Sequence, residues 1–313
     1  MEKVSIIVPC YNEEKALPLF VKELNRVINE MKNLYKVDFE VLLVNNCSED
    51  NTLSLMKEIS ANDTQYKYIS FSRNFGKDSS MYAGLKHATG NYVAILDADL
   101  QDPPELLIEM YEALTKEGYD SAEAIRADRK GEPKLRSLLA DMFYGMMSKI
   151  SMTNIDKGAR DFRLMKKKMK DAILSLEESE RFTKGIFSWV GFKTKKVYFE
   201  NKQRVAGETK LPTSSAFKYA FRGIVSFSTA PLLLTSIMGM IFFISAIIYT
   251  LCVIINQLFI TRATPGYASL MCIMLFGFGL VLLMLGIIGQ YIAQSYLEIK
   301  HRPKYIIDET NVN

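Results

Sequence analysis

Hydrophobic and polar positions divide the chain into two parts of different character. Charged residues are dense and mixed from Met1 to Arg222, whereas Gly223–Thr261 and Ala263–Leu297 contain none. These uncharged stretches of about 39 and 35 residues exceed the ~20 residues that a membrane-crossing helix needs. We therefore expect a globular part followed by a transmembrane hairpin, with helices at about 231–260 and 268–297.

Short apolar runs alternate with helical periodicity in the first hundred residues. The runs typical of buried strands are Val4–Val8, Phe39–Val44, Tyr66–Phe71 and Tyr92–Leu96. Helical patterns lie between them at Lys15–Asn33, after a cap at Asp50 or Asn51, and at Ser79–His87. This order predicts an α/β (Rossmann-like) domain with a mostly parallel sheet. Later expected elements are a strand at Tyr119–Ala124, helices at Pro133–Ile150 and Arg181–Trp189, and a strand at Lys195–Glu200.

Basic residues around the apolar stretches predict the orientation in the membrane. Lysines and arginines flank the pair of stretches on the outside, and only Arg262 stands between them. The positive-inside rule therefore places both termini and the globular part in the cytoplasm, at the inner (plasma) membrane. Residues 214–228 suit an amphipathic helix on the membrane surface. The expected division is a catalytic domain at 1–213, this helix, the hairpin at 229–300 and a cytoplasmic tail at 301–313.

The string Asp97-Ala98-Asp99-Leu100-Gln101 ends the fourth predicted strand with two carboxylates. Two acids at the end of a buried strand repel each other, and a divalent cation removes that repulsion. Mg²⁺ or Mn²⁺ bound to a nucleotide takes such hard oxygen ligands, and phosphates complete its shell. The alternative is a solvated turn with capping acids.

Several motifs resemble the family-2, inverting glycosyltransferases of the GT-A fold. The strings that carry the resemblance include Val8–Glu14, Ser72–Lys77, Asp97–Glu105, Asp161–Leu164 and Ala206–Lys210. Within that family the chain is similar to polyprenyl-phosphate sugar transferases, such as dolichyl-phosphate mannose synthases and bacterial bactoprenol glucosyl- or N-acetylglucosaminyltransferases. The resemblance covers nearly the whole chain and includes the two terminal apolar helices.

The resemblance implies a role for each matching residue. Pro9, Tyr11 and Glu13 correspond to the loop that holds the nucleoside, and Arg204 to a contact with the donor pyrophosphate. Asp97, Asp99 and Gln101 correspond to the metal and pyrophosphate site. Arg126 and Arg136 resemble arginines that hold the lipid phosphate, and the basic run that contains them would otherwise be a solvated face.

Two positions leave alternatives open. The family usually has Asp-Asp-Gly-Ser where this chain has Asn45-Asn46-Cys47-Ser48, so Asn46 either reads the base differently or is neutral drift. Cys47 replaces a glycine at a turn, which removes conformational freedom. Asp161 is a structural ion-pair partner, a catalytic base as the resemblance implies, or a residue that orients Arg163 or another arginine in the acceptor site.

The resemblance therefore implies a metal-dependent hexosyltransferase. It would move a sugar from a nucleotide-sugar, UDP-glucose or UDP-N-acetylglucosamine, to undecaprenyl phosphate for cell-envelope glycan modification. Alternatives are a GDP-mannose-dependent enzyme and a catalytically impaired scaffold; the Gln-x-x-Arg-Trp string of processive polysaccharide synthases is missing. Gly279, Gly286 and Gly289 favour close helix packing and a homo-oligomer. No nucleic-acid partner is expected.

Overall fold

The computed structural model describes residues 1–127, 159–178, 181–200, 230–259 and 266–312. It separates into two compact units, Met1–Ala220 with Arg302–Asn313, and Phe221–His301. The predicted helix Pro133–Ile150 and the surface helix at 214–228 lie outside the described residues. The boundaries expected at 213 and 228 therefore stay predictions.

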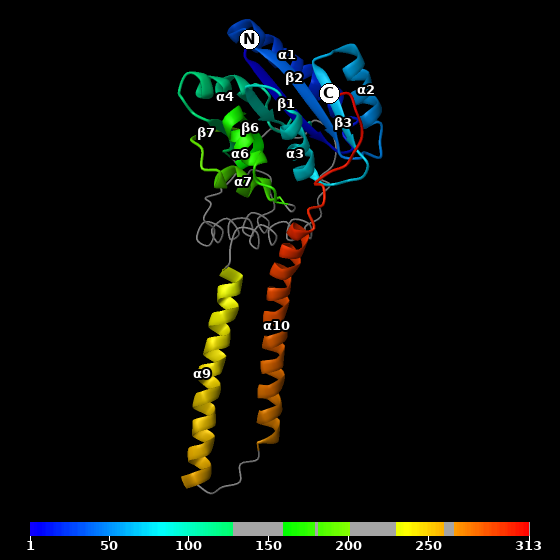
Figure 1. Cartoon of the computed structure of the whole chain (residues 1–313). Helices are drawn as coiled ribbons and strands as arrows, with labels where there is room; N and C mark the ends of the chain where they lie inside the picture. Colours follow the sequence, from blue (N-terminus) through cyan, green and yellow to red (C-terminus); the bar gives the residue numbers. More distant parts are fainter. Residues whose placement is uncertain (128–158, 179–180, 201–229, 260–265, 313) are drawn as a thin grey trace. The chain divides into compact units, whose positions relative to one another are not determined.

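The first unit is built on an eight-stranded sheet in the order β7-β5-β6-β4-β1-β2-β3-β8 (Figure 1). The neighbouring strands in the run β4-β1-β2-β3 are parallel to one another. Strand β6 is antiparallel to both of its neighbours, β4 and β5. The strands are β1 (Lys3–Cys10), β2 (Asp38–Asn45), β3 (Tyr66–Phe71), β4 (Tyr92–Ile95), β5 (Ser121–Arg126), β6 (Ala159–Lys166), β7 (Thr194–Phe199) and β8 (Ile307–Thr310). The α/β class and the mostly parallel character of the sheet are confirmed.

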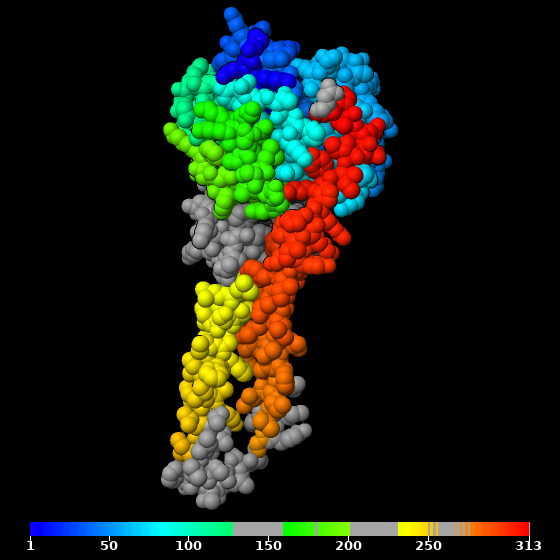
Figure 2. All heavy atoms as spheres, viewed as in Figure 1, coloured from blue at the N-terminus to red at the C-terminus, as the bar shows by residue number. Residues whose placement is uncertain are grey.

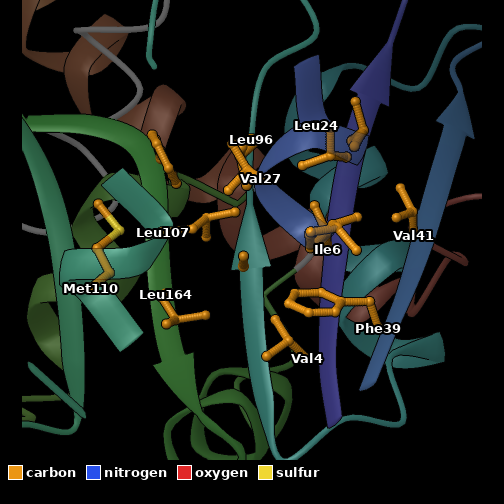
Figure 3. Packing of buried hydrophobic residues seen from close by; sticks show 14 of the residues in the cluster. Val4, Ile6, Leu24, Val27, Phe39, Val41, Leu96, Leu107, Met110 and Leu164 are labelled. Atoms are coloured by element: carbon orange, nitrogen blue, oxygen red, sulfur yellow. The ribbon is translucent and has the colours of Figure 1, made fainter. Parts of the chain in front are cut away.

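Helices cover both faces of the sheet, and α1 and α4 each bury an apolar stripe. The helices are α1 (Leu17–Tyr35), α2 (Thr52–Asn62), α3 (Lys77–His87), α4 (Leu106–Thr115), α6 (Lys167–Leu174) and α7 (Thr183–Trp189). In α1 the stripe is Leu17, Phe20, Leu24, Val27, Ile28 and Met31. It packs on β1 and β2, with α4 beside it, in one hydrophobic core (Figure 3).

Helix α3 packs on the opposite face, where β1 presents Ile7. A Cβ atom on Gly84 would lie 2.2 Å from Ile7 Cγ2, so only glycine allows this close approach. The contact fixes the depth of α3 against the sheet. It thereby fixes Lys77, the first residue of the helix.

The C-terminal residues add a strand that the sequence pattern did not predict. Strand β8 pairs antiparallel with β3, and Tyr305 stacks on Phe71 with ring centroids 5.1 Å apart. Figure 2 shows this red segment lying against the cyan part of the same domain. The segment expected to be a separate tail at 301–313 therefore belongs to the sheet of the globular unit.

The second unit contains α9 (Ala230–Phe259) and α10 (Tyr267–Ile299). Both have windows apolar enough to cross a membrane, Pro231–Tyr249 and Phe276–Ile299, with mean hydropathy 2.3 and 2.0. Phe242 on α9 packs against Phe276 and Gly277 on α10. The expected pair of apolar helices is confirmed. A Cβ atom on Gly279, Gly286 or Gly289 would meet nothing within 4 Å among the described residues.

Candidate active site at the carboxyl edge of the sheet

The loops after β1 and β2 are joined by hydrogen bonds. The Asn12 backbone N–H donates to Ser48 Oγ at 2.9 Å, and the Glu49 N–H donates to Asn12 Oδ1 at 2.8 Å. The Glu13 N–H donates to Thr52 Oγ1 at 2.8 Å. The predicted nucleoside-binding segment Pro9–Glu13 therefore covers the end of β1 and the loop after it, and it lies against the segment that contains Asn46.

Asn46 is buried, and its side chain holds the loop that precedes α3. Its Oδ1 accepts the Phe75 N–H at 2.8 Å, and its Nδ2 donates to Asn74 Oδ1 at 2.8 Å. Asn74 Oδ1 also accepts the Gly76 N–H at 2.9 Å. Both ends of the amide are thus engaged by residues 74–75. The predicted contact with the base stays a prediction, and it would have to share this amide with the loop.

Cys47 has φ +57°, in the left-handed region that glycine adopts without strain. The sequence comparison with the family pattern therefore identified a position where the backbone itself favours glycine. Leu100, inside the acidic motif after β4, has φ +56° for the same kind of tight turn.

Asp97 and Asp161 lie near the end of β4, where Lys77 contacts both of them. The pairing of β4 with β6 ends with Ile95 opposite Arg163, and Asp97 and Asp161 each lie two residues beyond that pair. Lys77 Nζ lies 2.6 Å from Asp97 Oδ1 and 2.6 Å from Asp161 Oδ2. The structure therefore brings two predicted site residues together around a lysine that sequence reasoning did not assign.

The charge around Asp161 keeps it ionised. Its burial favours the neutral form, but the charges of Lys77, Lys184 and Arg160, together with the Lys77 hydrogen bond, hold the pKa of Asp161 well below its usual range. Such a carboxylate is a weak base at neutral pH. Among the described residues its ion-pair partner is Lys77, so the cation that Asp161 orients here is a lysine and not Arg163.

Asp99 and Asp102 complete the acidic segment. Asp99 is buried and accepts the Gln101 N–H at 3.1 Å. Asp102 pairs with Arg160 Nε at 2.9 Å. Burial, with the charges of Asp97 and Asp99, raises the pKa of Asp102 to about 6 although Arg160 opposes the rise. Negative charge is therefore concentrated where β4 ends, and one arginine offsets part of it.

The predicted acceptor-site arginines are in different environments. Arg126 is half-buried at the end of β5 and pairs in register with Phe199. Arg163 is 4% exposed; it pairs with Glu123 at 2.7 Å and stacks over the Phe187 ring. These contacts favour a structural role for Arg163 over contact with the acceptor. Arg136 and Arg204 lie outside the described residues.

Sequence reasoning missed Lys77 as a site residue, and Arg160 and Lys184 as well. Lys77 ends the quoted Ser72–Lys77 string, but nothing in the pattern shows that the first residue of a helix after β3 reaches across to β4. Arg160 directly precedes Asp161 in the sequence. Strand β6, which carries both residues, was not predicted.

Asp97, Asp99 and Gln101 offer only oxygen ligands, the type that Mg²⁺ and Mn²⁺ prefer. The Gln101 side-chain oxygen also lies 3.4 Å from Arg160 Nη2. In the part of the chain that the structure describes, no group of three or more His, Cys, Asp or Glu could hold a metal ion. If Asp97, Asp99 and Gln101 held a cation, substrate oxygens could complete its shell.

Comparison with known proteins identifies the family. The model of glycosyl transferase family 2 matches residues 5–174. The putative glycosyltransferase CsbB of Bacillus subtilis (strain 168) is 41% identical over 309 residues, which cover 99% of this chain and 92% of that protein. The prophage bactoprenol glucosyl transferase homolog of Escherichia coli (strain K12) is 38% identical over 308 residues, covering 97% and 98%.

Other similar proteins include the bactoprenol glucosyl transferase of Shigella phage SfV, 38% identical over 308 residues, with 97% of this chain and 98% of that protein covered. Among solved structures, glucosyl-3-phosphoglycerate synthase from Mycobacterium tuberculosis aligns with a TM-score of 0.46 and 16% identity, covering 72% and 78%. The family-model match and the full-length relatives confirm the resemblance read from the motifs. The chain belongs to glycosyl transferase family 2.

Proposed function

We propose that this glycosyltransferase moves a sugar from a nucleotide-sugar to a polyprenyl phosphate. The main support is the cluster of acidic residues near the end of β4, formed by Asp97, Asp99 and Asp161. The same chain has two helices that are apolar enough to anchor it in a membrane. The bactoprenol glucosyl transferases to which it is similar over nearly full length support the lipid acceptor. The proposed donor is UDP-glucose or UDP-N-acetylglucosamine.

A divalent cation, Mg²⁺ or Mn²⁺, would be held by Asp97, Asp99 and Gln101. When bound it would supply positive charge to the leaving nucleoside diphosphate. The protein residues position the donor: the Pro9–Glu13 segment for the nucleoside, and Arg204 for the pyrophosphate as the family resemblance implies. Arg126 and Arg136 are proposed to hold the acceptor phosphate.

In the proposed reaction an oxygen of the acceptor phosphate attacks the anomeric carbon. The carbon–oxygen bond to the nucleoside diphosphate breaks, and a carbon–oxygen bond to the lipid phosphate forms with inversion. No proton has to be removed, because the second pKa of a phosphate monoester is about 6 and its oxygens are already anionic at neutral pH. Asp161, whose pKa is depressed, then acts by holding Lys77 rather than as a base.

The chain connectivity supports the proposed sidedness. Helix α10 ends at Ile299, and β8 begins at Ile307 in the sheet of the catalytic unit. A folded domain lies on one side of a membrane, so the end of α10 must emerge on the side of the catalytic unit. A hairpin with both ends in the cytoplasm satisfies this condition and would tether the catalytic unit to the membrane that carries the acceptor.

The test is transfer by the purified full chain in detergent, with a panel of radiolabelled UDP- and GDP-sugars and undecaprenyl phosphate. We expect lipid-linked product with a UDP-sugar, and loss of nearly all product in excess chelator or with Asp99→Ala, while the thermal midpoint stays close to that of the wild type. Product from GDP-mannose alone would favour the mannose alternative. Near-normal turnover in excess chelator would overturn the metal-dependent reaction, and no nucleotide release with any donor would favour a scaffold.

A further inference from the structure

Lys77 contacts two acidic residues, Asp97 in the segment after β4 and Asp161 on β6. Its Nζ lies 2.6 Å from Asp97 Oδ1 and 2.8 Å from Asp97 Oδ2, and it donates to Asp161 Oδ2 at 2.6 Å. One ammonium group therefore engages both oxygens of Asp97. Asp97 is also a proposed ligand of the divalent cation.

The position of Lys77 is set by the backbone that precedes it. Gly76 has φ +90°, and the N–H groups of Phe75 and Gly76 are held by Asn46 and Asn74. At its other end, α3 is held close to β1 through Gly84. Lys77 is thus presented to Asp97 by a fixed helix start, and the contact is not a chance meeting of two flexible surface side chains.

A divalent cation and the ammonium group of Lys77 compete for the carboxylate of Asp97. A divalent cation takes carboxylate oxygens at about 2.0–2.2 Å, and it repels an ammonium group held on the same oxygens. Lys77 has an alternative partner in Asp161, which it contacts equally closely. If Lys77 releases Asp97, its ammonium group can therefore stay paired with the carboxylate of Asp161.

The charges in the site favour binding of the divalent cation together with the nucleoside diphosphate. Asp102 is offset by Arg160, and Lys77 and Lys184 offset most of the charge on Asp97, Asp99 and Asp161. A divalent cation alone would bring two positive charges to a site whose acidic residues already have cationic partners. A nucleoside diphosphate brings negative charge and further oxygen ligands together with the cation.

We propose that Lys77 is an internal competitor for the divalent cation: it occupies Asp97, weakens binding of the free cation, and so couples metal binding to binding of the nucleoside diphosphate. This inference rests on the proposed function, because it takes Asp97 as a metal ligand of a nucleotide-sugar transferase. It assigns Lys77 a positioning role in the order of substrate binding.

The experiment measures Mn²⁺ affinity of the full chain in detergent, by the electron paramagnetic resonance signal of free Mn²⁺, with and without UDP or GDP. Lys77→Met should bind Mn²⁺ about tenfold more tightly than the wild type when no nucleotide is present, since a charge-assisted hydrogen bond to Asp97 is lost. If Lys77 has already released Asp97 in the nucleotide complex, Lys77→Met should leave the Mn²⁺ affinity of that complex near the wild-type value, so the tightening that the nucleotide gives should shrink about tenfold. By linkage, Mn²⁺ should then tighten nucleotide binding correspondingly less. Lys77→Arg keeps the cation and should stay close to the wild type.

Lys184→Met is the matched control. Lys184 also acts electrostatically on Asp161, but its Nζ donates to the Ala159 carbonyl at 3.0 Å. Lys184→Met therefore removes one positive charge near Asp161 but leaves the contact between Lys77 and Asp97 in place. We expect less than about a twofold change in Mn²⁺ affinity, because the effect through space is screened by water.

Mn²⁺ binding by Lys77→Met that is equal to or weaker than that of the wild type would overturn the competition. A tenfold gain in the Mn²⁺ affinity of Lys184→Met would also overturn it, because the gain would then come from the net charge of the site and not from the contact with Asp97. The proposed metal site is tested separately with Asp99→Ala. If that change leaves Mn²⁺ affinity intact in both the wild type and Lys77→Met, the metal site itself is misplaced and the inference falls with it.

Discussion

Asp161→Asn separates an orienting carboxylate from a catalytic base. The substitution keeps the shape of the side chain and an oxygen that Lys77 can donate to, but it removes the negative charge. In the structure that oxygen lies 2.6 Å from Lys77 Nζ. The perturbation therefore converts a charge-assisted hydrogen bond into a neutral one and leaves the rest of the site unchanged.

The two roles predict losses of different size. Charge-assisted hydrogen bonds contribute about 1.5–3 kcal/mol and neutral ones about 0.5–1.5 kcal/mol, so an orienting Asp161 should lose on the order of 1 kcal/mol, or roughly fivefold to tenfold in rate. The Lys77 side chain is 42% exposed, which places the effect at the lower end of this range. Loss of a general base costs about 10²–10⁴-fold.

The assay is the rate of sugar transfer to a polyprenyl phosphate between pH 5 and 8, with separate titration of donor and acceptor. We expect Asp161→Asn to keep measurable activity, and its rate to rise with pH through about 6 and then level, because ionisation of the acceptor controls it. Asp161→Ala should lose much more, since Lys77 then has only Asp97. If Asp161→Asn is as inactive as Asp161→Ala while both bind the acceptor normally, the charge or basicity of Asp161 is required and our reasoning is wrong.

Glu40→Gln should lower the free energy of unfolding near neutral pH by about 3 kcal/mol, because burial is outweighed by hydrogen bonds from Ser5, Lys3 and Thr89 that lower the pKa of Glu40 from 4.5 to about 2. The difference from the wild type in thermal unfolding should shrink as pH falls from about 4.5 toward 2, and a constant difference would contradict this. Cys47→Gly should stabilise the protein by about 1 kcal/mol by relieving its positive φ, whereas Cys47→Ala should not. Asn46→Asp should leave UDP and GDP competition unchanged, and a changed preference would show that Asn46 reads the base.

The first half of the sheet could be predicted because its strands are fully buried apolar runs. Strand β3 has the predicted bounds Tyr66–Phe71, and β1, β2 and β4 differ from prediction by one or two residues. Strand β6 could not be found this way, because Arg160 and Asp161 are adjacent and Arg163 follows soon after, which leaves neither an apolar run nor a regular alternation. Only the folded sheet shows that Glu123 on β5 pairs with Arg163 and makes such a charged strand tolerable.

The acidic motif after β4 was predicted because two carboxylates at a strand end are a local pattern. The role of Lys77 was not predictable, because its contacts with Asp97 and Asp161 span 20 and 84 positions in the sequence. Similarly, Asn46 was read as a departure from a nucleotide-binding pattern, and its amide is used to hold Asn74 and the Phe75 backbone. Contacts of this kind depend on how helix α3 is seated on the sheet.

Strand β8 makes the catalytic domain discontinuous, with the two apolar helices inserted between β7 and β8. During synthesis, the edge of β3 exposes unpaired backbone groups until β8 is made, and β8 is made after both apolar helices. An open edge of this kind can pair with other chains. Completion of the sheet therefore waits until both apolar helices have been synthesised, and a chain that ends after α10 would carry both helices but an unfinished sheet.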